Sequence, residues 1–128
     1  MPASTPATIV REFLGAWPRR DLEELMGFFA ADAVYHNVPV APCVGATAIR
    51  ETFAGFLATM PGIVLDVVHL VAEGTFVMVE RIDRFVMPTG HRFDLPVTGV
   101  FEVRDGKIVA FRDYFDLATF ESGSGLRL

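Results

Sequence analysis

Apolar residues recur every three or four positions in the first half of the chain, which is the spacing of helices that bury one face. A first helix is predicted to begin at Thr5-Pro6, a hydroxyl N-cap followed by proline, and to end at Pro18. A second begins near Asp21, which forms a capping-box-like pair with Glu24. A third begins at Gly45 and ends before residues 61–62. The apolar faces of the three are Ile9, Val10, Phe13, Leu14 and Trp17; Leu22, Leu25, Met26 and Phe29; and Ile49, Phe53, Phe56, Leu57 and Met60.

After Gly62 the chain changes to β-branched and aromatic runs separated by turn residues. Strands are predicted near 63–72, 75–87, 91–103 and 107–116, and a short earlier strand covers roughly 33–38. Helices followed by a four-stranded meander predict an α+β fold. We expect the N-terminal helices to pack in the concave face of a curved, mixed, mostly antiparallel sheet. Such a cone leaves one pocket at its open end.

The length of 128 residues favours a single domain. We expect this domain to cover 1–121, with Ser122-Gly123-Ser124-Gly125 opening a flexible C-terminal tail over 122–128. Hydrophobic residues make up 52% of the chain and the mean hydropathy is +0.40. This apolar excess has to be hidden in a core, a pocket or a subunit interface, and it is consistent with a homodimer.

Charge and composition exclude several classes of partner. The net charge of −5 argues against nucleic acid, whose phosphates repel a negative surface. No apolar run reaches the ~18 residues that a membrane-spanning helix needs. The first six residues lack the basic start and apolar core of a secretory signal. The single Cys43 forms no internal disulfide, so we expect a cytoplasmic protein.

Polar side chains occupy strand positions that should face the core. Side chains alternate between the two faces of a strand, so residues of equal parity are neighbours. Arg81 and Asp83 alternate with Val77, Val79 and Phe85; Asp113 alternates with Val109, Phe111 and Phe115; and Tyr35 and Asn37 share a face with Ala33. If these faces point inward, one cavity holds two carboxyls, a guanidinium, a phenol and a carboxamide.

Burying an isolated charge costs several kcal/mol, on the order of its desolvation, so these groups should pair. The planar fork of Arg81 can hold both carboxyls at once. Two alternatives stay open on parity alone. The residues can form a purely structural Asp–Arg–Asp network, or their side chains can reach solvent at the strand ends.

Other kinds of site lack support in the sequence. His36, His69 and His91 lie on separate segments without ligand spacing, so no metal site is expected. There is no Gly-x-Ser-x-Gly nucleophile motif and no glycine-rich nucleotide loop. Cys43 has no evident histidine partner.

Three segments resemble the signature segments of limonene-1,2-epoxide hydrolases: Tyr35-His36-Asn37-Val38-Pro39, Glu80-Arg81-Ile82-Asp83 and Arg112-Asp113-Tyr114-Phe115-Asp116-Leu117. Gly99-Val100-Phe101 and Asp105-Gly106-Lys107-Ile108 are similar to the same region in order and spacing. The resemblance covers roughly residues 28–120. Each motif alone is common in strands, whereas five in the right order are a much stronger signal.

The resemblance implies the cone fold shared with ketosteroid isomerases and nuclear transport factor 2. It implies that Asp83, Arg81 and Asp113 form the catalytic machinery and that Tyr35 and Asn37 hold a water molecule. Asp113 would be the base and Asp83 the acid in a one-step addition of water to a small apolar epoxide of terpene or cycloalkene type, which gives a vicinal diol. Family members use no metal or organic cofactor and no covalent intermediate, and they are usually dimeric.

The sequence leaves one ambiguity and two competing functions open. Asp116 can be confused with Asp113, and Asp113 is preferred because it alternates with two phenylalanines. One competing function is a ketosteroid-isomerase-like isomerase or cyclase, in which one aspartate removes a proton beside a carbonyl. The other is a non-catalytic small-molecule binding module on the same fold. A buried pair of acids bridged by Arg81 fits both of these poorly.

Overall fold

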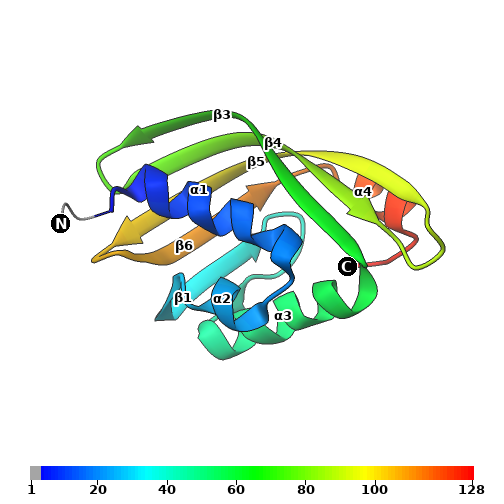
Figure 1. Ribbon diagram of the computed structural model, residues 1–128, viewed down its shortest axis with the longest axis horizontal. Helices are drawn as coiled ribbons and strands as arrows, with labels where there is room; N and C mark the ends of the chain where they lie inside the picture. Colours follow the sequence, from blue (N-terminus) through cyan, green and yellow to red (C-terminus); the bar gives the residue numbers. More distant parts are fainter. Residues whose placement is uncertain (1–3) are drawn as a thin grey trace.

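The computed structural model describes residues 4–128 and shows one sheet curving over the N-terminal helices (Figure 1). The elements in chain order are α1 (Pro6–Ala16), the 3₁₀ helix η1 (Trp17–Arg19), α2 (Leu22–Met26), β1 (Phe29–Asn37), β2 (Cys43–Val44), α3 (Ala46–Thr59), β3 (Gly62–Glu73), β4 (Phe76–Val86), β5 (Arg92–Arg104), β6 (Lys107–Tyr114) and α4 (Leu117–Ser124). Among these residues, no helix is long and apolar enough to cross a membrane.

The six strands form a single mixed sheet in the order β2-β1-β6-β5-β4-β3. Neighbours pair antiparallel except β1 and β6, which run parallel. The last four strands are therefore the predicted meander, and β1 adds to its free edge at β6. This confirms the predicted α+β cone with a curved, mostly antiparallel sheet.

The predicted helix starts are confirmed by their caps. The Thr5 hydroxyl accepts a hydrogen bond from the backbone N–H of Thr8, at 3.2 Å. The Asp21 carboxylate accepts one from the N–H of Glu24, also at 3.2 Å. The first helix was predicted to end at Pro18, whereas α1 ends at Ala16 and continues directly into a 3₁₀ helix. Pro18 lies inside η1, which closes at Arg20 in the left-handed conformation (φ 57°).

Two face assignments from the sequence are wrong. Phe29 lies in β1 and not on the second helix, because α2 already ends at Met26. Val109 does not share the buried face with Phe111, because β6 bulges there: Glu102 pairs with Ala110 and Val103 with Ile108. Ile108 is fully buried in its place. A bulge inserts one residue and reverses the parity, which strict alternation cannot anticipate.

The start of the C-terminal segment also differs from the sequence prediction. Residues 122–124 belong to α4, whose N-cap Asp116 accepts a hydrogen bond from Thr119 N–H at 2.9 Å. Gly123 is close-packed: a Cβ there would lie 2.4 Å from the ring of Phe93. The glycine thus serves helix packing, which composition alone cannot distinguish from a flexible tract.

The core lies between the concave face of the sheet and α1. Phe13 of α1 is fully buried, and its ring makes aromatic contacts with five other phenylalanines and Trp17. Burying such rings stabilises the fold by roughly 1.5–3 kcal/mol each. Toward one end of the cone this packing opens into a cavity.

Candidate active site

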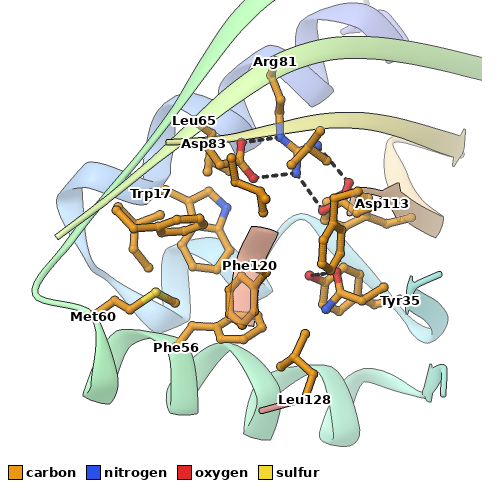
Figure 2. A pocket seen from close by; sticks show the side chains of 17 residues that line it. Trp17, Tyr35, Phe56, Met60, Leu65, Arg81, Asp83, Asp113, Phe120 and Leu128 are labelled. Atoms are coloured by element: carbon orange, nitrogen blue, oxygen red, sulfur yellow. Dashed lines mark hydrogen bonds and ion pairs between the residues drawn. The ribbon is translucent and has the colours of Figure 1, made fainter. Parts of the chain in front are cut away.

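The five site residues predicted from the sequence all line one cavity at the open end of the cone (Figure 2). Tyr35 and Asn37 come from β1, Arg81 and Asp83 from β4, and Asp113 from β6. The rest of the lining is apolar apart from the indole nitrogen of Trp17. The space free of atoms is about 550 Å³, which includes solvent at the mouth of the cavity.

Arg81 bridges the two carboxyls, and these three residues are called the inner triad below. Its Nε and Nη2 donate to the two oxygens of Asp83, at 2.7 and 3.0 Å. Its Nη1 and Nη2 donate to the two oxygens of Asp113, at 2.9 and 2.6 Å. Only 1% of Arg81 and 5% of each aspartate are exposed to solvent. The structure therefore excludes side chains that reach solvent at the strand ends.

Gly99 makes this bridge possible, because β5 lies between the strands that carry Arg81 and Asp113. Gly99 pairs with Asp113 on β6, and the Arg81 side chain reaches over the glycine from β4. A Cβ on Gly99 would lie 2.6 Å from Arg81 Nη1 and 2.9 Å from Asp113 Oδ1. Only glycine leaves the ion pair room to form across the strand.

The parallel pairing of β1 with β6 places the two neutral polar residues beside one acid only. Asn37 is the register partner of Asp113, and Tyr35 is the partner of Phe111. The Tyr35 hydroxyl donates to Asn37 Oδ1 at 2.9 Å, and its ring stacks on Phe111 at 4.8 Å. This hydrogen bond leaves the Asn37 amide N–H₂ free to donate in a defined direction.

Burial shifts the titration of every ionisable group in the cavity. It raises the pKa of Asp83 to about 6, against the opposing effect of Arg81. It raises the pKa of Asp113 as well, again opposed by Arg81. Burial together with the negative charge of Asp113 raises the pKa of Tyr35 far above its usual value. The phenol thus remains a hydrogen-bond donor throughout the physiological range.

The charge balance of the inner triad favours one proton on the acid pair. Burial works to lower the pKa of Arg81, but both carboxylates outweigh it and keep the guanidinium charged. Two ionised carboxylates would leave a buried net charge of about −1, whereas one retained proton makes the cluster neutral. Two acids in unequal surroundings are how proteins obtain one acid and one base from the same residue type.

The sequence prediction missed two residues of the cavity wall and one glycine beneath the inner triad. Trp17, assigned to the core face of a helix, lines the cavity from η1. Leu128, assigned to a flexible tail, lines it from the C-terminal segment. Gly99 was noted only as part of a motif of the resemblance, and nothing in the sequence indicated that it leaves room for the Arg81–Asp113 ion pair. Three-dimensional position alone reveals all three.

Other candidate groups lie outside the cavity. Asp116 is exposed and caps α4, so Asp113 is the aspartate that faces inward. His69 is exposed and contacts Glu80 at 2.7 Å, and His36 contacts the carbonyl of Val40 at 2.8 Å. Within residues 4–128, no group of three or more His, Cys, Asp or Glu side chains is arranged to hold a metal ion.

The chain is similar to proteins of one superfamily along nearly its whole length. The SnoaL-like domain family matches residues 10–111. "Epoxide hydrolase EphG" of Mycobacterium tuberculosis is 35% identical over 111 residues, which is 84% of this chain and 71% of that protein. The structure of an M. tuberculosis LEH-like epoxide hydrolase superposes with a TM-score of 0.81 at 29% identity, covering 92% of this chain and 87% of that one.

A more distant structure shares the fold alone. It is a protein with a ketosteroid isomerase-like fold from Catenulispora acidiphila, with a TM-score of 0.83 at 24% identity, covering 96% of this chain and 95% of that one. The relationship to EphG and to the LEH-like structure confirms the resemblance to limonene-1,2-epoxide hydrolases. The chain belongs to the SnoaL-like domain family and, within it, is related to an epoxide hydrolase of the limonene-1,2-epoxide hydrolase-like type.

Proposed function

We propose that this protein is an epoxide hydrolase that adds water to a small apolar epoxide in one step and releases a vicinal diol. One observation carries the proposal: two buried acids share one arginine, and a Tyr–Asn pair lies beside only one of them. This asymmetry separates a water-activating acid from a proton-donating acid. The relationship to EphG supports the same chemistry.

Asp113 is the base in this proposal, because it neighbours the groups that can hold a water molecule. The water donates one hydrogen to the Asp113 carboxylate and the other to the Tyr35 oxygen. It accepts a hydrogen bond from the Asn37 amide, which leaves one lone pair directed at the substrate. Arg81 keeps the Asp113 carboxylate in place through its two hydrogen bonds.

Asp83 is the acid, because it lies on the far side of Arg81 from the Tyr–Asn pair. As the water oxygen bonds to an epoxide carbon, the carbon–oxygen bond of the ring breaks, and its electron pair stays on the departing oxygen. That oxygen takes the proton of Asp83, while the water proton passes to Asp113. The active state returns when Asp113 loses its proton and Asp83 regains one. No group in this sequence of steps forms a covalent bond to the substrate.

The remainder of the cavity favours an apolar substrate. Its wall is made of aromatic and aliphatic side chains from η1, α3, α4, four strands and the segments next to them: Trp17, Phe56, Met60, Ile63, Leu65, Phe85, Leu95, Val97, Phe111, Phe115, Phe120 and Leu128. Such a wall binds the hydrocarbon part of a terpene or cycloalkene oxide by excluding water from it. The proposed chemistry calls on no metal or organic cofactor.

The inner triad also separates this proposal from its competitors. An isomerase needs one base and donors aimed at a carbonyl oxygen, and a second acid held by the same arginine has no part in that reaction. A binding module for apolar molecules has no reason to bury two carboxyls, since burial of charge costs free energy. The inner triad therefore fits epoxide hydrolysis better than isomerisation or simple binding.

The decisive experiment measures diol formation from limonene oxide, cyclohexene oxide and styrene oxide in H₂¹⁸O. With enzyme in excess, direct attack by water puts ¹⁸O into the diol in the first turnover. Attack by an aspartate would put an unlabelled carboxylate oxygen there instead. Labelled diol from at least one epoxide supports the proposal, and folded protein that forms no diol from any of them argues for the isomerase or binding functions.

Two further features stay predictions: a homodimer and a cytoplasmic location. The outer face of the sheet exposes several large apolar side chains, including Val71, Phe76, Met78 and Tyr114. Exposed apolar patches of this kind are typical of subunit interfaces. Light scattering behind size-exclusion chromatography distinguishes a dimer from a 14.1 kDa monomer.

A further inference from the structure

The indole N–H of Trp17 is a buried donor that the protein does not use. Trp17 is 4% exposed, and its Nε1 has no hydrogen-bond partner among the residues that the structure describes. Trp17 lines the cavity together with Asp83. In Figure 2 its nitrogen lies on the edge of the indole turned toward Asp83 and the space between them.

An unpaired buried donor is costly, which makes its position informative. Leaving such a group without a partner costs about 1–3 kcal/mol, and the great majority of buried polar groups in native proteins are paired. The ring is held in place by an edge-to-face contact with Phe53 at 4.9 Å and by Phe13 at 6.1 Å. The donor is therefore fixed in direction before any ligand arrives.

The other polar groups of the cavity already have tasks in the proposed reaction. Arg81 is occupied by its two carboxyls, and Tyr35 and Asn37 form a pair beside Asp113. Asp83 serves the epoxide oxygen. All five lie on strands, whereas Trp17 lies on η1 and approaches the cavity from the helical side. Its N–H is thus a separate donor, suited to a separate acceptor on the ligand.

The surroundings also indicate which kind of acceptor fits. A hydroxyl that accepts from Trp17 brings its own hydrogen, and Asp83, the acceptor that the indole edge faces, already accepts from Arg81 at both oxygens and serves the epoxide oxygen in the proposed reaction. A carbonyl oxygen accepts without donating and leaves nothing unpaired. The hydrocarbon part of the ligand beside that carbonyl can pack against the aromatic wall of the cavity.

We propose that Trp17 selects the substrate by donating a hydrogen bond to a carbonyl oxygen that the epoxide carries in addition to its ring oxygen. The preferred substrate class is then an apolar epoxyketone. This inference rests on the proposed epoxide hydrolysis and deepens it. Asp83 and Asp113 act on the epoxide ring, and Trp17 donates a hydrogen bond to a carbonyl elsewhere in the same substrate.

The kinetic test compares cyclohexene oxide with two ring-ketone analogues, with the carbonyl next to the epoxide or one carbon further away. Trp17→Phe keeps an aromatic ring against Phe53 and removes the donor. Both substrates lose part of the apolar wall in this variant, and we expect kcat/KM to fall about 10- to 100-fold further for the better ketone than for cyclohexene oxide. Taking each ratio between variant and wild type cancels the intrinsic reactivities of the epoxides.

A matched control alters the wall without touching a donor. Phe56→Leu should change kcat/KM for ketone and hydrocarbon epoxides by similar factors, since Phe56 contributes only apolar surface to the cavity. Equal losses on both substrates in Trp17→Phe would overturn the proposal and assign Trp17 to the ring oxygen or to packing. Unchanged rates on both would overturn it as well.

A binding test is independent of hydrolysis. The chain contains one tryptophan, so its NMR spectrum has one indole N–H resonance. Titration with cyclohexanone should shift this resonance downfield to saturation, and methylenecyclohexane, which lacks the oxygen, should not. Absence of the ketone shift would overturn the carbonyl site even if epoxides are hydrolysed. A saturable shift without diol from any epoxide would support the carbonyl site and overturn the hydrolase proposal.

Discussion

Two clusters, each of one arginine of β4 and two aspartates, lie on opposite faces of the sheet in opposite surroundings. The inner triad lies on the concave face, and an outer triad of Asp66, Arg84 and Asp94 lies on the convex face. Arg84 contacts Asp66 at 2.6 Å and Asp94 at 2.7 Å, close to the distances within the inner triad. The side chains of the outer triad are 49–56% exposed, whereas those of the inner triad are 1–7% exposed.

Burial is therefore what separates a candidate catalytic site from a surface ion-pair network. Water screens the charges of the outer triad and solvates both of its carboxylates, so their ion pairs with Arg84 contribute little free energy. In the inner triad, burial away from solvent raises the pKa of both acids, and Arg81 limits that rise. The outer triad supplies a control for each change made to the inner one.

The largest contrast is expected from removing the base. Asp113→Asn keeps the shape of the side chain but cannot accept the water proton, so diol formation should fall by about 10³-fold or more. Asp94→Asn, the same change in the outer triad, should leave the rate within about 2-fold of wild type. Steady-state diol production measures both. A residual rate above about a tenth of wild type in Asp113→Asn would remove Asp113 from the mechanism.

Removing the cation should reveal the same contrast in stability. Arg81→Leu leaves two buried carboxyls without their partner and should lower the free energy of unfolding by about 3–5 kcal/mol at pH 8. Arg84→Leu should cost far less, because water takes over the solvation of Asp66 and Asp94. Urea unfolding gives both values. Equal losses would show that burial is not the difference between the triads.

The raised pKa values predict how stability depends on pH. The folded protein holds the Asp83 proton up to about pH 6, whereas the unfolded chain loses it near the usual value of about 4. This contribution is fully present below about pH 4 and is lost as the pH rises through about 6. Asp113 acts in the same direction. Relative to Asp83→Asn, wild type should lose on the order of 2–3 kcal/mol across this interval.

Urea unfolding at several pH values checks this slope, with Asp94→Asn expected to follow wild type. The same titration removes the proposed acid, so kcat/KM should decline as the pH rises above about 6. A wild-type curve that becomes more stable relative to Asp83→Asn between pH 4 and 6 would contradict the raised pKa.

A smaller effect is expected from filling the space above Gly99 of β5, across which Arg81 reaches Asp113. The Cβ of Gly99→Ala has to push Arg81 away from Asp113, which should lower diol formation about 10- to 100-fold by misplacing the base. Gly15→Ala is the control, since a Cβ at that position of α1 would point into open space. Activity and thermal unfolding of both variants provide the comparison. An unimpaired Gly99→Ala would show that the bridge is not needed in this form.

Much of this architecture follows from local patterns. Helix caps at Thr5 and Asp21 depend on neighbouring residues, and the inward position of Arg81 and Asp83 follows from the period of two along β4. Both could be predicted because the causes lie within a few residues. The predictions for Phe29 and Val109 failed where a helix ended early and where a bulge reversed the parity.

The sequence by itself determined the α+β class, the inward faces of the strands and the five polar residues on them, because backbone geometry sets side-chain direction over short distances. Only the tertiary structure decided which of these residues meet. Arg81 and Asp113 are 32 residues apart and join across Gly99, and parallel pairing with β6 sets Asn37 beside Asp113. The donor of Trp17 likewise faces a cavity that exists only once helix and sheet have packed. Burial, which distinguishes the inner triad from the outer one, is a property of that packing.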